Sequence, residues 1–103
     1  MRRVVWSDSA LEEFSSVVAY IARDNPAAAL SVANRLEAAV MALAELPTGR
    51  KGRVTGTYEK VVGGLPYIIA YALGDAPPER GTLTVLRIIH GARDWPDGSW
   101  PER

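Results

Sequence analysis

The first half of the chain carries apolar residues at the spacing of amphipathic helices. One stripe, at positions i, i+3, i+7 and i+10, consists of Leu11, Phe14, Val18 and Ile21, and this period predicts a helix with one face in the core. Ser9 and Glu12 form a Ser-x-x-Glu capping box, in which two side chains satisfy backbone donors at a helix start. We therefore expect a first helix from about Ser9 to about Arg23, packed against a second helix or a sheet.

A second helix is predicted directly after the first. Asn25 is a good N-cap residue, and Pro26 fits the first helical position, where its missing N–H group costs nothing. The apolar stripe that follows consists of Ala29, Ala33, Leu36, Val40 and Leu43. The segment 46–49, Leu-Pro-Thr-Gly, ends this helix. The two helices are thus expected to form a hairpin with a tight connection.

After Gly49 the pattern changes to that of β-strands. Strands are expected within residues 54–62, with a kink near Gly56, and over residues 67–73 and 82–89. A β-branched and aromatic run at residues 3–6 predicts one more strand before the helices. The order β-α-α-β-β-β, with short turns between consecutive strands, predicts an α+β domain whose antiparallel sheet carries the helical hairpin on one face.

Composition narrows the class of protein. A chain of 103 residues, 48% hydrophobic and 23% charged, is typical of one soluble globular domain. It has no cysteine and one histidine, so neither a disulfide framework nor a metal site is expected, and no cofactor is implied. The N-terminus lacks the apolar region of a signal peptide, and we expect a cytoplasmic protein that does not contact a membrane.

The net charge is zero, but positive charge gathers in one window. Residues 48–63 hold Arg50, Lys51, Arg53 and Lys60 against Glu59 alone. Proteins that bind nucleic acids directly are usually strongly basic overall. We therefore expect no direct sequence-specific binding to nucleic acid, and the window is either a solvated loop or a local binding surface.

The final predicted strand runs into a cluster of polar and aromatic side chains. Arg87, His90, Arg93 and Trp95 lie in the sequence Arg-Ile-Ile-His-Gly-Ala-Arg-Asp-Trp-Pro, residues 87–96. Such a cluster is compatible with an RNA-cutting site and equally with the rim of a protein-binding surface. A histidine at a strand end is more often a packed or capping residue than a catalyst.

The segments, taken in order, resemble the RelE/ParE superfamily of bacterial type II toxins. The resemblance rests on an early strand and on the segments Tyr20-Ile21-Ala22, Asn25-Pro26-Ala27-Ala28-Ala29, residues 46–54, residues 65–71 and residues 90–96. It covers residues 3 to about 96 and is closer to the ParE branch than to the RelE branch. It implies a single toxin domain at residues 1–96, followed by a short C-terminal tail at residues 97–103.

The superfamily holds two activities. The resemblance implies a ParE-like toxin that inhibits DNA gyrase, associated with plasmid stabilization, and not an enzyme. Its partner would be a cognate antitoxin, a small ribbon-helix-helix-type protein with a disordered tail, in a toxin–antitoxin hetero-oligomer. The alternatives are a RelE-like, ribosome-dependent mRNA endoribonuclease and a degenerate member that binds its antitoxin without being toxic.

The nuclease alternative needs a base, an acid and cations at one phosphate. His90 could serve as the acid or base, and Arg87 and Arg93 could clamp the phosphate. In a straight strand, however, Arg87 and His90 point to opposite faces unless a bulge re-aims them. RNA-cutting relatives commonly carry a tyrosine near the C-terminus, whereas no tyrosine follows Tyr71 in this chain.

We therefore interpret the cations as binding residues and favour no catalytic residue. The expected surface for the target or the antitoxin contains Arg50, Lys51, Arg53, Arg87, Arg93 and Trp95. Arg87 is expected on the strand face of Leu83, Val85 and Ile89. If that face is covered, Arg87 needs a carboxylate partner, for which Glu59 is the best candidate. The open case, with Arg87 in one positive patch with the basic window, is favoured.

Overall fold

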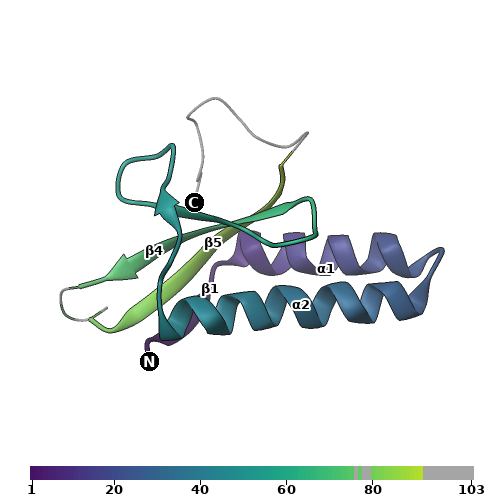
Figure 1. Cartoon of the computed structure of the whole chain (residues 1–103), viewed down its shortest axis with the longest axis horizontal. Coiled ribbons are helices and arrows are strands. Elements are labelled where there is room, and N and C mark those ends of the chain that lie inside the picture. The colour runs from purple at the N-terminus through teal and green to yellow at the C-terminus, as the bar shows by residue number, and fades with distance from the viewer. Residues whose placement is uncertain (76, 78–79, 92–103) are drawn as a thin grey trace.

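A computed structural model describes residues 1–75, 77 and 80–91. Two helices and five strands follow one another in the order β1, α1, α2, β2, β3, β4, β5. Their bounds are β1 Arg3–Trp6, α1 Asp8–Ala22, α2 Pro26–Glu45, β2 Arg50–Lys51, β3 Tyr58–Val61, β4 Tyr67–Gly74 and β5 Thr82–His90. The two helices form a hairpin that covers one side of the sheet, and the loop after β2 lies on the other side (Figure 1).

The sheet is mixed, with the strand order β1-β5-β4-β3-β2. The predicted α+β class and the helical hairpin on one face are confirmed. The sheet is not wholly antiparallel as expected, because β1 pairs with β5 in parallel, from Arg3 opposite Thr82 to Trp6 opposite Val85. The other neighbouring strands are antiparallel. A parallel neighbour becomes possible because the helices carry the chain back across the sheet between β1 and the later strands.

Each helix begins directly after a residue whose side chain caps it. Asn25 caps α2 by accepting the backbone N–H of Ala28 at 3.0 Å, and Pro26 occupies its first turn, as predicted. The predicted cap at Ser9 is wrong: the cap is Ser7, two residues earlier, and α1 begins at Asp8. Ser7 Oγ accepts the backbone N–H of Ala10 at 3.0 Å. Ser9 lies inside the first turn, because Ser7 is the residue that connects the end of β1 to the start of α1.

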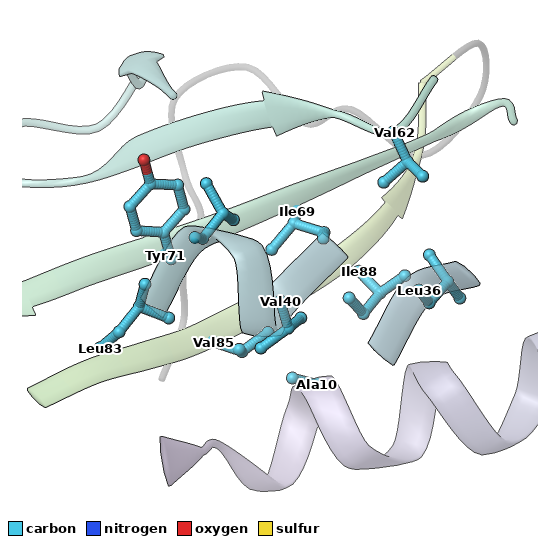
Figure 2. Packing of buried hydrophobic residues seen from close by; sticks show 10 residues of the cluster. Ala10, Leu36, Val40, Val62, Ile69, Tyr71, Leu83, Val85 and Ile88 are labelled. Atoms are coloured by element: carbon cyan, nitrogen blue, oxygen red, sulfur yellow. The ribbon is translucent and has the colours of Figure 1, made fainter. Parts of the chain in front are cut away.

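The core lies between the sheet and the helical hairpin. Figure 2 shows how Ala10 of α1 and Leu36 and Val40 of α2 meet the inner side of the sheet. The sheet side chains of this cluster are Val62, Ile69, Tyr71, Leu83, Val85 and Ile88. Leu11, predicted as part of the core stripe, is instead 49% exposed. Ala10, the preceding residue, is fully buried in the cluster instead.

Helix α2 is long and apolar enough to cross a membrane by length and composition alone. Five of its residues nevertheless lie in the interior of the domain. They are Ala29, Leu36, Val40, Leu43 and Ala44. The place of α2 in the core therefore accounts for part of its apolar character.

Tyr71 joins the core to the segment that leads into β2. Its ring is fully buried and stacks on Tyr58 at a centroid distance of 5.6 Å. Its hydroxyl accepts the backbone N–H of Gly49 at 2.9 Å. A Cβ atom at Gly49 would lie 2.7 Å from the carbonyl oxygen of Glu59, so only glycine permits this approach.

Replacing Tyr71 with phenylalanine should therefore destabilise the fold. The Gly49 N–H would lose its acceptor, and we expect a loss of about 1–3 kcal/mol in the free energy of unfolding. Urea titration at pH 7 measures this loss. Tyr20→Phe, at an exposed position on α1, is the matched control and should change stability little.

The pH dependence of the same titration gives a second check. Burial raises the pKa of Tyr71 above its ordinary value of 10.0, more than the hydrogen bond from Gly49 lowers it. Above pH 10 the unfolded tyrosine ionises before the folded one, so this residue makes the free energy of unfolding fall as the pH rises. The fall should be shallower in Tyr71→Phe than in the native chain, and an unchanged slope would contradict the assignment.

Candidate functional site

A β-bulge in β5 determines where the side chains of the final strand point. Val85 pairs with Tyr71 and Arg87 with Ala70, so Leu86 is an extra residue between them. Beyond the bulge Ile88 packs in the cluster on the helix side, whereas Leu86 and Ile89 pack in a second cluster with Ala70. The expectation that Arg87 shares a face with Leu83 and Val85 is therefore wrong, because the bulge reverses the alternation.

Arg87 is bound by Glu13 of α1. Glu13 Oε2 lies 2.6 Å from Arg87 Nε and 2.5 Å from Arg87 Nη2. The other carboxylate oxygen, Oε1, accepts the backbone N–H of Ile88 at 2.8 Å. The side chain of Arg87 keeps 19% of its exposure and that of Glu13 26%. The favoured expectation of an open Arg87 is wrong, and the partner expected in the covered case, Glu59, is wrong too.

Glu13 acts at the edge of the sheet that β1 leaves uncovered. Strand β1 pairs only with the first part of β5, from Thr82 to Val85. Just beyond that point Ser7 donates its backbone N–H to Val85 O at 2.9 Å and its hydroxyl to Leu86 O at 2.8 Å. Glu13 then accepts the Ile88 N–H. Side chains of the α1 region thus continue the hydrogen bonding that a longer β1 would have made.

His90 lies at the end of β5, opposite Tyr67 of β4. The two rings meet edge to face at a centroid distance of 5.7 Å. The bulge precedes Arg87, so the stretch from Arg87 to His90 alternates regularly and the two side chains leave opposite faces of the sheet. The described residues therefore do not bring Arg87 and His90 to one phosphate. Arg93 and Trp95, the remaining predicted members of this cluster, lie outside the described residues.

The first part of the basic window, residues 50–56, lies on the side of the sheet away from the helices (Figure 1). Lys60, the fourth cation of the window, belongs to β3. Arg50, Lys51 and Arg53 are all exposed, which agrees with their expected placement on the surface. Glu59 of β3 is 3% exposed and lies beneath them. Its Oε1 lies 3.5 Å from Arg50 Nη2, and its Oε2 accepts the backbone N–H of Arg53 at 2.8 Å.

Four large apolar side chains of the helical hairpin are exposed. They are Leu11 and Tyr20 of α1 and Leu30 and Met41 of α2, each between 46% and 70% exposed. Leu30 and Met41 are eleven positions apart and share one face of α2, whereas Leu11 and Tyr20 are nine positions apart and leave opposite faces of α1. The helical period assigned Leu11 to the core, so the sequence pattern alone did not predict its exposure.

A polar hollow of about 360 Å³ lies where the N-terminal segment meets the β4–β5 end. It is lined by Met1, Arg2, Ala44, Glu45, Gly74, Asp75, Arg80 and Gly81. Two arginines and two carboxylates balance one another there, which favours neither an anion nor a cation. Within residues 1–75, 77 and 80–91, no group of three side chains could hold a metal ion.

Comparison with known proteins identifies the family. A family model described as "ParE toxin of type II toxin-antitoxin system, parDE" matches residues 4–95. The Y4kP protein of Sinorhizobium fredii is 38% identical over 96 residues, which are 92% of this chain and 94% of that protein. Toxin RelE2 of Caulobacter vibrioides is 37% identical over 94 residues, 90% of this chain and 99% of its own.

A solved structure has the same fold. The structure described as "Chromosomal ParDE TA system from P. aeruginosa" superposes with a TM-score of 0.75 at 17% identity, over 87% of this chain and 96% of its own. The chain belongs to the ParE toxin family of type II toxin–antitoxin systems, within the RelE/ParE superfamily.

The Glu13–Arg87 contact gives a testable consequence for stability. Glu13→Ala removes a charged partner of Arg87 and the acceptor of the Ile88 N–H, and we expect a loss of about 2–3 kcal/mol in the free energy of unfolding. Glu13→Gln keeps a neutral acceptor of nearly the same shape and should lose about half as much. Chemical denaturation measures both. Glu12→Ala, at the exposed neighbouring position, is the control, and an equal effect of the two alanine variants would refute the assignment.

Proposed function

We propose that the chain is a cytoplasmic toxin that inhibits DNA gyrase by binding to it, without catalysing a reaction. The observation that carries this proposal is the state of Arg87. Its guanidinium is tied to Glu13 at 2.5–2.6 Å and is four-fifths covered. An arginine that is committed to a structural carboxylate is poorly suited to clamp a phosphate, whereas it suits a rigid binding module.

The endoribonuclease alternative is less well supported. Arg87 and His90 leave opposite faces of β5, and the ring of His90 packs edge to face on Tyr67. General acid–base catalysis needs its groups within hydrogen-bonding reach of one reacting site. The chain as a whole carries no net positive charge for docking on ribosomal RNA. One relative is named toxin RelE2. The experiment on the target therefore also measures mRNA cleavage.

The regulatory partner in this proposal is a cognate antitoxin. The solved structure with the same fold is a ParDE system, and the family is that of ParE toxins of type II toxin–antitoxin systems. Leu30 and Met41, which share one exposed face of α2, offer apolar contacts for an amphipathic segment. The antitoxin would then be a small ribbon-helix-helix-type protein whose C-terminal tail is disordered alone and folds on the toxin. A member that binds this antitoxin without toxicity is the third possibility.

The choice of target is tested with purified components. The protein should inhibit negative supercoiling by DNA gyrase, or trap gyrase-cleaved DNA, and should leave mRNA intact in a ribosome-programmed translation reaction. His90→Ala should inhibit gyrase as well as the native chain does. Site-specific mRNA cleavage that His90→Ala abolishes would establish the endoribonuclease instead. Inertness in both assays, with antitoxin binding retained, would establish the non-toxic possibility.

The antitoxin contact is tested by truncation. The candidate to test is the product of a small reading frame adjacent to the toxin gene, where the genome carries one. The full antitoxin should bind the toxin tightly, and deleting its C-terminal tail should weaken binding at least about 100-fold, or about 2.7 kcal/mol, since the tail supplies the contacts. Calorimetry measures both, and circular dichroism should record a gain of helix on mixing. Tight binding by the antitoxin core without its tail would contradict the proposal.

A further inference from the structure

We propose that Glu59 is a positioning residue, whose buried carboxylate holds the basic loop, residues 50–56, as a preformed surface for an acidic segment of the antitoxin. This inference rests on the proposed function for the identity of the partner. It adds a second contact region to the exposed apolar side chains of α2. The basic loop and the helical hairpin lie on opposite sides of the sheet (Figure 1).

Glu59 is a buried carboxylate, and a buried charge needs polar partners. It is 3% exposed, and its side chain 2%, on the sheet side away from the helices. A carboxylate is strongly disfavoured in such a place unless hydrogen bonds and a cation satisfy it. Both are present: the backbone N–H of Arg53 donates to Oε2 at 2.8 Å, and Arg50 Nη2 lies 3.5 Å from Oε1. Both partners of the carboxylate belong to the basic loop.

The rest of the loop is closed by short contacts of its own. Gly52 donates its N–H to Thr57 O at 2.8 Å, and Thr57 donates its hydroxyl to Val54 O at 2.6 Å. On the other side of β2, Gly49 is fixed to the hydroxyl of Tyr71. The loop is thus anchored at both ends and across its base. A loop ordered before binding loses less conformational entropy when a partner docks.

The chemistry of the loop points to carboxylates. Arg50, Lys51 and Arg53 are exposed within four positions, and the side chain of Arg50 keeps 67% of its exposure. Guanidinium groups match carboxylates with paired hydrogen bonds. The patch is short, and the chain as a whole carries no net positive charge, so a long polyanion such as RNA would gain few favourable contacts beyond it. A short acidic stretch of protein fits this charge distribution.

Glu59→Gln separates positioning from simple charge. The substitution keeps the shape of the side chain and makes the loop more positive by one unit. If the loop attracted the antitoxin only by net charge, Glu59→Gln would bind the antitoxin more tightly. If Glu59 positions the loop, the variant should bind about 3- to 10-fold more weakly, mainly through faster dissociation, despite the added charge. Asp75→Asn, the same charge change at an exposed position after β4 and outside both proposed contact regions, is the matched control and should bind as the native chain does.

Hydrogen exchange supplies a readout that does not depend on function. The amide of Arg53 should exchange faster in Glu59→Gln and at the native rate in Asp75→Asn. Arg50→Gln should slow association with the antitoxin at low salt and lose this effect at high salt. Unchanged or tighter antitoxin binding by Glu59→Gln would overturn the inference. So would a Glu59→Gln variant that binds a single-stranded RNA oligomer more tightly and the antitoxin as the native chain does. If the native chain does not inhibit gyrase but Glu59→Gln still weakens antitoxin binding, the proposed gyrase target is wrong and the role proposed for Glu59 stands.

Discussion

The arrangement of this domain depends on how the free edge of β5 is satisfied. Strand β5 has nine residues and its outer neighbour β1 has four. The backbone groups beyond Val85 would face solvent as an open edge, which is a place where other chains can add as strands. The carboxylate of Glu13 and the hydroxyl of Ser7 take the positions of missing strand atoms. Because both side chains belong to the start of α1 or its cap, this arrangement also fixes α1 against the sheet.

Two glutamates make the same pair of interactions in different parts of the molecule. Glu13 accepts the N–H of Ile88 and pairs with Arg87, and Glu59 accepts the N–H of Arg53 and pairs with Arg50. In each case one carboxylate oxygen accepts a backbone N–H, and the carboxylate pairs with a guanidinium group. The consequences differ with the exposure of the arginine. Arg87 is largely covered and serves the fold, whereas Arg50 is two-thirds exposed and remains able to meet a partner.

The sequence predicted those features that depend on neighbours in the chain. The cap at Asn25, the first-turn Pro26 and the strand of residues 3–6 followed from local rules, and the structure confirms them. The features that were missed depend on distant residues. Glu13 meets Ile88 across 75 positions, and no period of apolar residues marks such a contact. The bulge at Leu86 is one extra residue in an uninterrupted apolar run, so the alternation that placed Arg87 was off by one position beyond it.

The parallel pairing of β1 with β5 has a consequence for how the chain acquires its shape. Ser7 and Leu86 are 79 positions apart, yet they are hydrogen-bonded. On a ribosome the helical hairpin can form soon after it emerges, since its contacts are local, but β1 has no strand to dock on until β5 has been made. The sheet is therefore completed late in synthesis. During that interval the core is unfinished, because Leu83, Val85 and Ile88 of β5 are still missing from it.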